Sequence, residues 1–301
     1  MADFANQFWS WFIVIPVVLG LVGCLWLIFA NNKGKVTTDE TTDHVWDEDL
    51  REYNNPLPRW WLNMFIITVI FGAIYLILFP GLGTFKGVLG WTELNQYEAE
   101  IQAANHEFGP LYAQYAATDA KELIKNPDAM KTGARLFSTY CTTCHGSDAR
   151  GARGFPNLRD TDWQYGGEPE QIETTILQGR NGVMPPWGTV LKEENQLVEV
   201  AEYVRSLAGK EVDSGVAAKG EQHYTSLCAS CHGPDGTGNI QLGAPNLTDD
   251  IWLYGGSQRA IVQSVELGRN GIMPAHGEFL GKEKSHLLAA YVYSLSQEAA
   301  K

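Results

Sequence analysis

The sequence has few of the side chains that most often bind a metal or form crosslinks: five cysteines, five methionines and seven histidines in 301 residues. Positive charge is also scarce, since 22 Lys and Arg face 35 Asp and Glu, for a net charge of −13. This acidity argues against a nucleic-acid partner. Four of the five cysteines lie in two short motifs, so only Cys24 remains outside them.

These two motifs have the same form. Residues 141–145 read Cys-Thr-Thr-Cys-His and residues 228–232 read Cys-Ala-Ser-Cys-His. The C-x-x-C-H pattern is typical of c-type haem attachment, whereas a thioredoxin-like pair lacks the trailing His and a zinc site needs four ligands. Two thiols at this spacing can bond the two vinyl groups of one porphyrin, and the adjacent imidazole becomes the proximal ligand. The sequence predicts two covalently bound haems c, attached through Cys141, Cys144 and His145 and through Cys228, Cys231 and His232.

The segments that follow each motif also match, which indicates a tandem duplication. Pro-Asn-Leu occurs at 156–158 and 245–247, and Arg-Asn-Gly-x-Met-Pro occurs at 180–185 and 269–274. Only Met184 and Met273 occupy equivalent places in the two copies. We therefore expect them to be the axial thioether ligands, one for each iron. A role as core filler is less fitting, because a Met followed by Pro in a Gly-rich loop is poorly placed for a helix core.

Two histidines remain as rival ligands for the second haem. His223 precedes the second motif and His276 follows Met273, so either would give bis-His ligation. The equivalent positions in the first copy are Leu136 and Trp187, which offer its iron nothing comparable. Duplicated domains more often share a ligand set, which favours Met.

Helical segments flank the haem motifs. A Gly and an aromatic residue share one helical face before each motif, and an apolar helix is expected at the end of each copy, over 197–207 and 287–295. The glycines, Gly133 and Gly220, would let the two terminal helices of a copy cross closely. This order of elements resembles the class I cytochrome c fold. It predicts cytochrome c domains at 126–210 and 211–301.

Two apolar runs, at about 9–30 and 61–80, are long enough to cross a bilayer, which takes roughly 20 residues. A cleaved signal peptide fits the first run less well, because the segment before it has Asp3 and no Lys or Arg. Cys24 lies within this run and is expected to be a small buried hydrophobe, although its surroundings look like a lipoprotein cleavage site. Residues 1–87 are thus expected to form a membrane anchor, and 88–125 a helical connector.

The loop between the runs carries a further motif. Residues 47–61 read Asp-Glu-Asp-Leu-Arg-Glu-Tyr-Asn-Asn-Pro-Leu-Pro-Arg-Trp-Trp, which resembles the dihaem subunit, CcoP or FixP, of cbb3-type cytochrome c oxidases. Without that resemblance the acidic run reads as a solvated loop. The resemblance spans nearly the whole chain and implies an all-α protein: two N-terminal transmembrane helices followed by two tandem class I cytochrome c domains.

The resemblance also implies a function. A membrane-anchored electron-transfer subunit would accept electrons from a soluble or membrane cytochrome c donor. It would pass them on within a complex that contains a monohaem cytochrome c subunit and a catalytic haem–copper subunit, where oxygen reduction and proton pumping occur. With His and Met on both irons, this chain would not itself be catalytic. The alternatives are the cytochrome subunit of a dehydrogenase, or a haem sensor or peroxidase with one open iron position.

Haem attachment of this kind occurs outside the cytoplasm, so the C-terminal domains are expected on the periplasmic side of the bacterial inner membrane. Two spans then place the N-terminus outside as well. The connecting loop carries Lys33, Lys35, Arg51 and Arg59, whereas residues 1–8 carry no Lys or Arg, in agreement with the positive-inside rule.

This topology predicts a protection pattern. A protease added outside sealed spheroplasts should digest the haem domains and spare the loop between Lys33 and Arg59. Peptide mapping of the digest measures both, and permeabilised cells provide the control in which the loop is also cut. Cleavage of the loop in intact spheroplasts would contradict the two-span arrangement.

Overall fold

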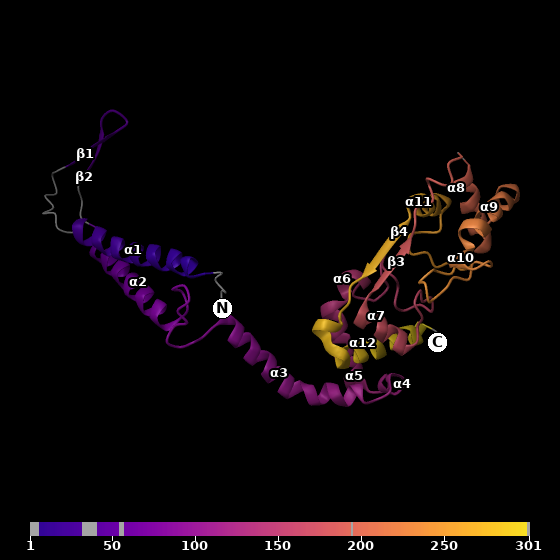
Figure 1. The fold of residues 1–301 in the computed structure, drawn as a ribbon, viewed down its shortest axis with the longest axis horizontal. Coiled ribbons are helices and arrows are strands. Elements are labelled where there is room, and N and C mark those ends of the chain that lie inside the picture. Colours follow the sequence, from indigo (N-terminus) through magenta and orange to yellow (C-terminus); the bar gives the residue numbers. More distant parts are fainter. Residues whose placement is uncertain (1–5, 32–40, 54–56, 194, 300–301) are drawn as a thin grey trace. The chain divides into compact units, whose positions relative to one another are not determined.

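The computed structural model describes residues 6–31, 41–53, 57–193 and 195–299, in two compact units, Met1–Glu107 and Phe108–Lys301 (Figure 1). Both units are mostly helical, as predicted. The described residues also form two short antiparallel two-stranded ribbons, which the all-α prediction did not include. One of these ribbons lies at the centre of the second unit.

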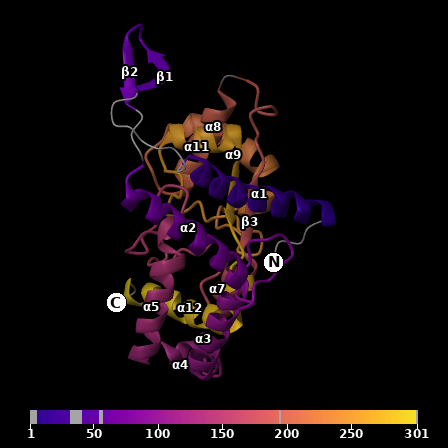
Figure 2. The same ribbon diagram turned by 90° about the vertical axis from the view of Figure 1, so that its left-hand side faces the viewer.

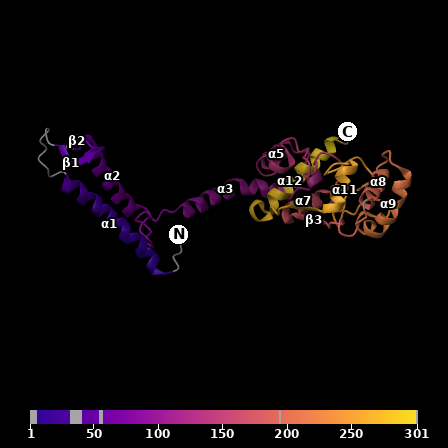
Figure 3. The same ribbon diagram turned by 90° about the horizontal axis from the view of Figure 1, so that it is seen from above.

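The first unit contains two long apolar helices that lie side by side, α1 (Gln7–Asn31) and α2 (Arg59–Leu78) (Figures 1 and 3). Both are long and apolar enough to cross a membrane. Large apolar side chains are exposed along both helices, which suits a lipid surrounding. Ser10 of α1 contacts the segment after α2, where the Thr84 N–H donates to Ser10 Oγ at 3.2 Å.

The acidic run between the spans is not simply a loop. Strands β1 (Thr41–Trp46) and β2 (Leu50–Tyr53) form an antiparallel hairpin. Asp47 and Glu48 take positive φ values of 43° and 72°, the backbone conformation that a tight hairpin turn requires. Lys33, Lys35 and the stretch 54–56, which belong to the topology and family motifs, lie outside the described residues.

The segment that follows the second span is helical. Helix α3 (Glu93–Ala116) is followed by the short α4 (Ala120–Leu123), which Asp119 caps by accepting the Lys121 N–H at 2.9 Å.

The second unit contains both copies of the repeat, each with the same series of elements. The first copy has α5 (Pro127–Tyr140), α6 (Thr142–His145), α7 (Pro169–Gln178), β3 (Arg180–Met184) and α8 (Gln196–Leu207). The second has α9 (Ser214–Leu227), α10 (Ala229–His232), α11 (Gln258–Leu267), β4 (Arg269–Met273) and α12 (Gly277–Ala299). Asn126 and Asp213 cap α5 and α9, each accepting two backbone N–H groups.

The two copies exchange their C-terminal helices. Helix α12 of the second copy packs on α5 and α7 of the first, while α8 of the first copy packs on α9 and α11 of the second (Figures 1 and 2). We call α5, α6, α7 and α12 the first helix group, and α8, α9, α10 and α11 the second helix group. The expectation that each copy closes on its own terminal helix was therefore wrong.

Gly133 and Gly220 lie against the exchanged helices α12 and α8. A Cβ on Gly133 would lie 2.8 Å from Cβ of Tyr291 in α12, and one on Gly220 would overlap the Glu199 carbonyl in α8. Beside them the rings of Phe137 and Tyr291 are 5.7 Å apart. The crossing predicted from glycine and aromatic residues is present, but between copies.

The exchange goes together with the pairing of β3 with β4. The two strands run antiparallel in register from Arg180 opposite Met273 to Met184 opposite Arg269, and they lie between the two helix groups (Figure 1). Equivalent backbone hydrogen bonds hold the segments that follow the two strands. The Trp187 N–H donates to Val265 O, and the His276 N–H donates to Ile176 O, both at 2.9 Å. Each strand thus delivers its chain to the other copy's helices.

Replacement of Gly220 by Ala should destabilise the second helix group by about 1–3 kcal/mol, because the added methyl would force α8 and α9 apart. Gly109→Ala is the matched control, since a Cβ there meets no atom within 4 Å. Thermal unfolding of the detergent-solubilised chain, followed by circular dichroism, measures both. Equal transition temperatures for the two variants would contradict the close crossing.

Candidate haem sites

Each motif occupies one tight helical turn at the end of a longer helix. The His145 N–H donates to Cys141 O and the His232 N–H to Cys228 O, both at 3.0 Å. In both copies the first cysteine is partly buried and the second is exposed. The turn therefore presents two thiols and one imidazole from five consecutive residues.

Backbone carbonyls orient both imidazoles. His145 Nδ1 lies 3.2 Å from Pro156 O, and His232 Nδ1 lies 3.1 Å from Pro245 O. Because a carbonyl oxygen only accepts, Nδ1 is the protonated nitrogen and Nε2 keeps the lone pair that a metal needs. Burial lowers the pKa of both histidines, which favours the neutral, metal-binding form.

Burial also acts on the first cysteine of each motif. It raises the pKa of Cys141 and of Cys228 to about 11. A free thiol at either position would therefore be protonated at neutral pH, with little thiolate for side reactions.

Each motif shares its core with the methionine of the other copy. Met273 packs against the core of the first helix group together with Cys141, and Met184 packs against the core of the second together with Cys228. The sequence analysis predicted both methionines as axial ligands. Their assignment to the motif of their own copy, implied by the duplication, does not agree with this packing.

The two rival histidines have other neighbours. His223 Nε2 lies 3.4 Å from Glu199 Oε2, on the surface where α8 crosses α9. His276 Nδ1 lies 2.7 Å from Pro274 O, and its backbone is bonded to Ile176 in α7. His276 thus packs with the first helix group, which does not contain the second haem motif, the one for which it was the rival ligand.

One pair of residues near the sites was not identified from the sequence. Arg180 lies opposite Met273 in the β3–β4 ribbon. Its Cζ lies 4.9 Å from the centre of the Tyr165 ring, and its Nε donates to Thr175 Oγ1 at 3.0 Å. Arg269 repeats the arrangement on Tyr254, at 4.4 Å, and Ser264, with its Nε 3.0 Å from Oγ. Opposite residues of an antiparallel pair share a face, so a fixed guanidinium accompanies each methionine. The repeated Arg-Asn-Gly sequence marks both arginines as equivalent, but it does not show which side chains they contact.

The acidic segment just before Trp163 contains a carboxyl group with a raised pKa. Burial, with the charges of Asp249 and Asp160, raises the pKa of Asp162 to about 6. This carboxyl group thus titrates close to neutral pH, in the segment of the first copy just before Trp163.

The residues present fit a covalently attached porphyrin. Each motif offers two thiols, a neutral imidazole with Nε2 available and a thioether in the same core. In addition, the buried Trp252 Nε1 has no hydrogen-bond acceptor among the described residues. A propionate is the kind of acceptor that would satisfy such an indole.

The fold and sites define a c-type cytochrome with a membrane anchor. Comparison with known families agrees: residues 38–86 match the N-terminal domain of cytochrome oxidase-cbb3, FixP, and residues 128–204 and 215–292 match cytochrome c oxidase, cbb3-type, subunit III. The chain belongs to this cbb3 oxidase subunit family, known as CcoP or FixP. Its cytochrome c domains bind haem c covalently, and its role is electron transfer within the oxidase.

Curated relatives match over most of their length. Subunit CcoP of the cbb3-type cytochrome c oxidase of Rubrivivax gelatinosus is 45% identical over 99% of this chain and 98% of its own. Subunit FixP of Sinorhizobium medicae is 39% identical over 87% and 96%, and CcoP of Cereibacter sphaeroides is 36% identical over 87% and 97%. The resemblance seen in the sequence is confirmed.

Proposed function

We propose that this chain carries two haems c, accepts single electrons from a periplasmic cytochrome c donor and delivers them to the catalytic haem–copper subunit of a cbb3-type oxidase. The observation that carries the proposal is the duplicated site, in which each C-x-x-C-H turn shares a core with a methionine. A monohaem cytochrome c subunit of the same complex is the expected neighbour in the path.

The proposed ligand sets cross the two copies. His145 with Met273 would hold one iron, and His232 with Met184 the other. Bound haem supplies a one-electron couple, and methionine ligation raises its potential relative to bis-His ligation. The prolyl carbonyls hold each imidazole in place, and burial limits water at its ring. With an imidazole and a thioether to hold each haem, the chain would offer no open site for oxygen or peroxide, which argues against a sensor or peroxidase.

The exchange also bears on transfer between the sites. Since each methionine is on a strand hydrogen-bonded to the other, the ribbon ties the two ligand sets together through backbone bonds. Electron transfer benefits from a fixed separation between the centres, and this connection supports one. The periplasmic side is proposed for the second unit, because haem attachment occurs there and the charge pattern of the anchor agrees.

The number of haems can be measured directly. Mass spectrometry of the denatured chain should show the added mass of two haems, because thioether bonds survive denaturation. The double variant Cys141→Ser/Cys144→Ser should retain one haem, and so should Cys228→Ser/Cys231→Ser. A wild-type mass with a single haem would refute the proposal.

The crossed ligand sets predict which haem responds to which methionine. In the chain that keeps only the first motif, Met273→His should lower the reduction potential, whereas Met184→His should leave it nearly unchanged. A shift of about 59 mV already alters the equilibrium of a one-electron centre tenfold, so redox titration resolves the difference. In the chain that keeps only the second motif, the two effects should be reversed. Response to the methionine of the same copy would show that each domain closes on itself.

A further inference from the structure

Helix α3 has an apolar stripe with the spacing of a coiled coil. Its members alternate three and four residues apart, and most are well exposed; we call this stripe the α3 seam, formed by Leu94, Tyr97, Ile101, Ala104, Phe108 and Leu111. Tyr97 is 59% and Leu94 52% exposed. Residues at this spacing lie on one face of a single helix. An apolar face of this length normally packs against another helix.

Charge follows the same repeat. A glutamate precedes every second residue of the α3 seam, at Glu93, Glu100 and Glu107. These three residues are seven apart and occupy the g position of the heptad. Helix α3 contains no Lys or Arg. Among the described residues none of these three carboxylates forms an ion pair. In coiled coils the flanking positions set the choice of partner by pairing with the opposite charge.

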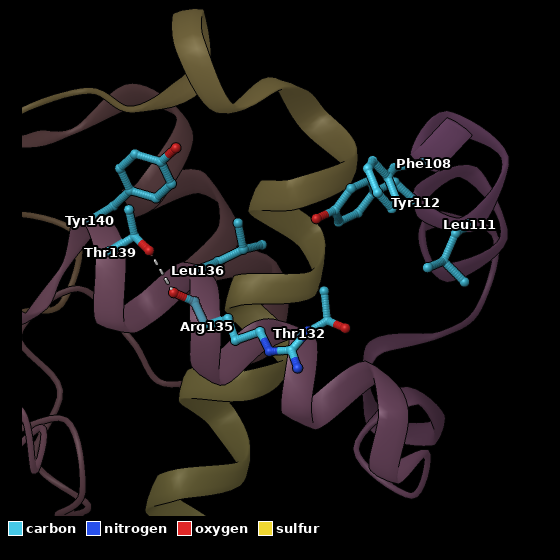
Figure 4. A pocket seen from close by; sticks show the side chains of 8 residues that line it. All are labelled: Phe108, Leu111, Tyr112, Thr132, Arg135, Leu136, Thr139 and Tyr140. Carbon is cyan, nitrogen blue, oxygen red and sulfur yellow. Dashed lines mark hydrogen bonds between the residues drawn. The ribbon is translucent and has the colours of Figure 1, made fainter. Parts of the chain in front are cut away.

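The C-terminal end of the α3 seam borders a groove. Phe108, Leu111 and Tyr112 line one side, and residues of α5, including Leu136 and Tyr140, line the other, around about 300 Å³ of open space (Figure 4). Apart from Arg135, the lining is aromatic, aliphatic or hydroxyl-bearing. Such a groove accepts large apolar side chains from a docked segment.

We propose that the α3 seam docks a helix of a neighbouring oxidase subunit, one with an apolar stripe of its own flanked by Lys or Arg. A second copy of this chain fits poorly, because in an antiparallel pair the same acidic flanks would face each other. A membrane surface with anionic lipids would be repelled by the same carboxylates. This inference rests on the proposed function, because a docked helix requires that the chain is part of an oxidase with other subunits.

A photocrosslinker tests the surface in the intact complex. Benzoylphenylalanine placed at Ile101, in the α3 seam, should crosslink to a peptide of another subunit with apolar heptads and flanking basic residues, identified by mass spectrometry of the complex purified in mild detergent. The same probe at Ala99, on the opposite face of α3, is the matched control and should give little product. Products with lipid or with a second copy, equal yields from the two positions, or no product from Ile101 would each overturn the proposal.

Charge reversal tests the partner's chemistry. Glu93→Lys/Glu100→Lys/Glu107→Lys should weaken retention of this chain in the complex by about tenfold, if each lost pair has the strength of an ordinary exposed ion pair. Ala99→Lys/Gln102→Lys/His106→Lys, on the outer face, should retain it. Haem content per chain, measured on both variants, monitors folding. Unchanged retention of the Glu variant would contradict a basic partner.

The two proposals fail in different ways. If the wild-type chain carries two haems and co-purifies with the oxidase while Ile101 does not crosslink, only the docking surface is refuted. If the wild-type chain has no oxidase subunits attached, the proposed function is refuted first.

Discussion

The antiparallel pairing of Arg180–Met184 with Arg269–Met273 determines the arrangement of the whole second unit. Five residues on each strand bring the two methionine segments together and send each chain on to the helices of the other copy. Because of this pairing, α12 completes the core around the first haem motif, and α8 completes the core around the second. The two copies of the repeat therefore form two mixed halves, each built from helices of both copies.

Much of this protein can be predicted from its sequence. The motifs at 141–145 and 228–232 specify haem attachment because their chemistry is local, and the equivalence of Met184 and Met273 follows from the repeat. The exchange could not be predicted in this way. Gly133 meets Tyr291, and Gly220 lies beside Tyr203, but the two copies are so alike that either terminal helix offers the same tyrosine to either glycine. Only the strand pairing, a long-range contact with a weak local signal, distinguishes the two arrangements.

A similar limit applies to the polar groups around the sites. The sequence shows Arg180 and Arg269 in equivalent positions, but their stacking on Tyr165 and Tyr254 depends on how the loops fold. The hairpin of β1 and β2 was missed because an acidic run has low strand propensity, and its turn depends on positive φ at Asp47 and Glu48, which are not the glycines that usually signal it. In both cases tertiary geometry, rather than local preference, determines the outcome.

The exchanged helices impose an order of events on biosynthesis. The cysteines at 141 and 144 leave the ribosome more than a hundred residues before α12, so the first helix group has an open core while most of the second copy is still being synthesised. For the second helix group, in contrast, α8 has already been synthesised when α9 emerges. Contacts between residues so distant in the chain form slowly. The first motif thus waits longest for its finished surroundings, and the last helix to leave the ribosome closes the helix group that began to form first.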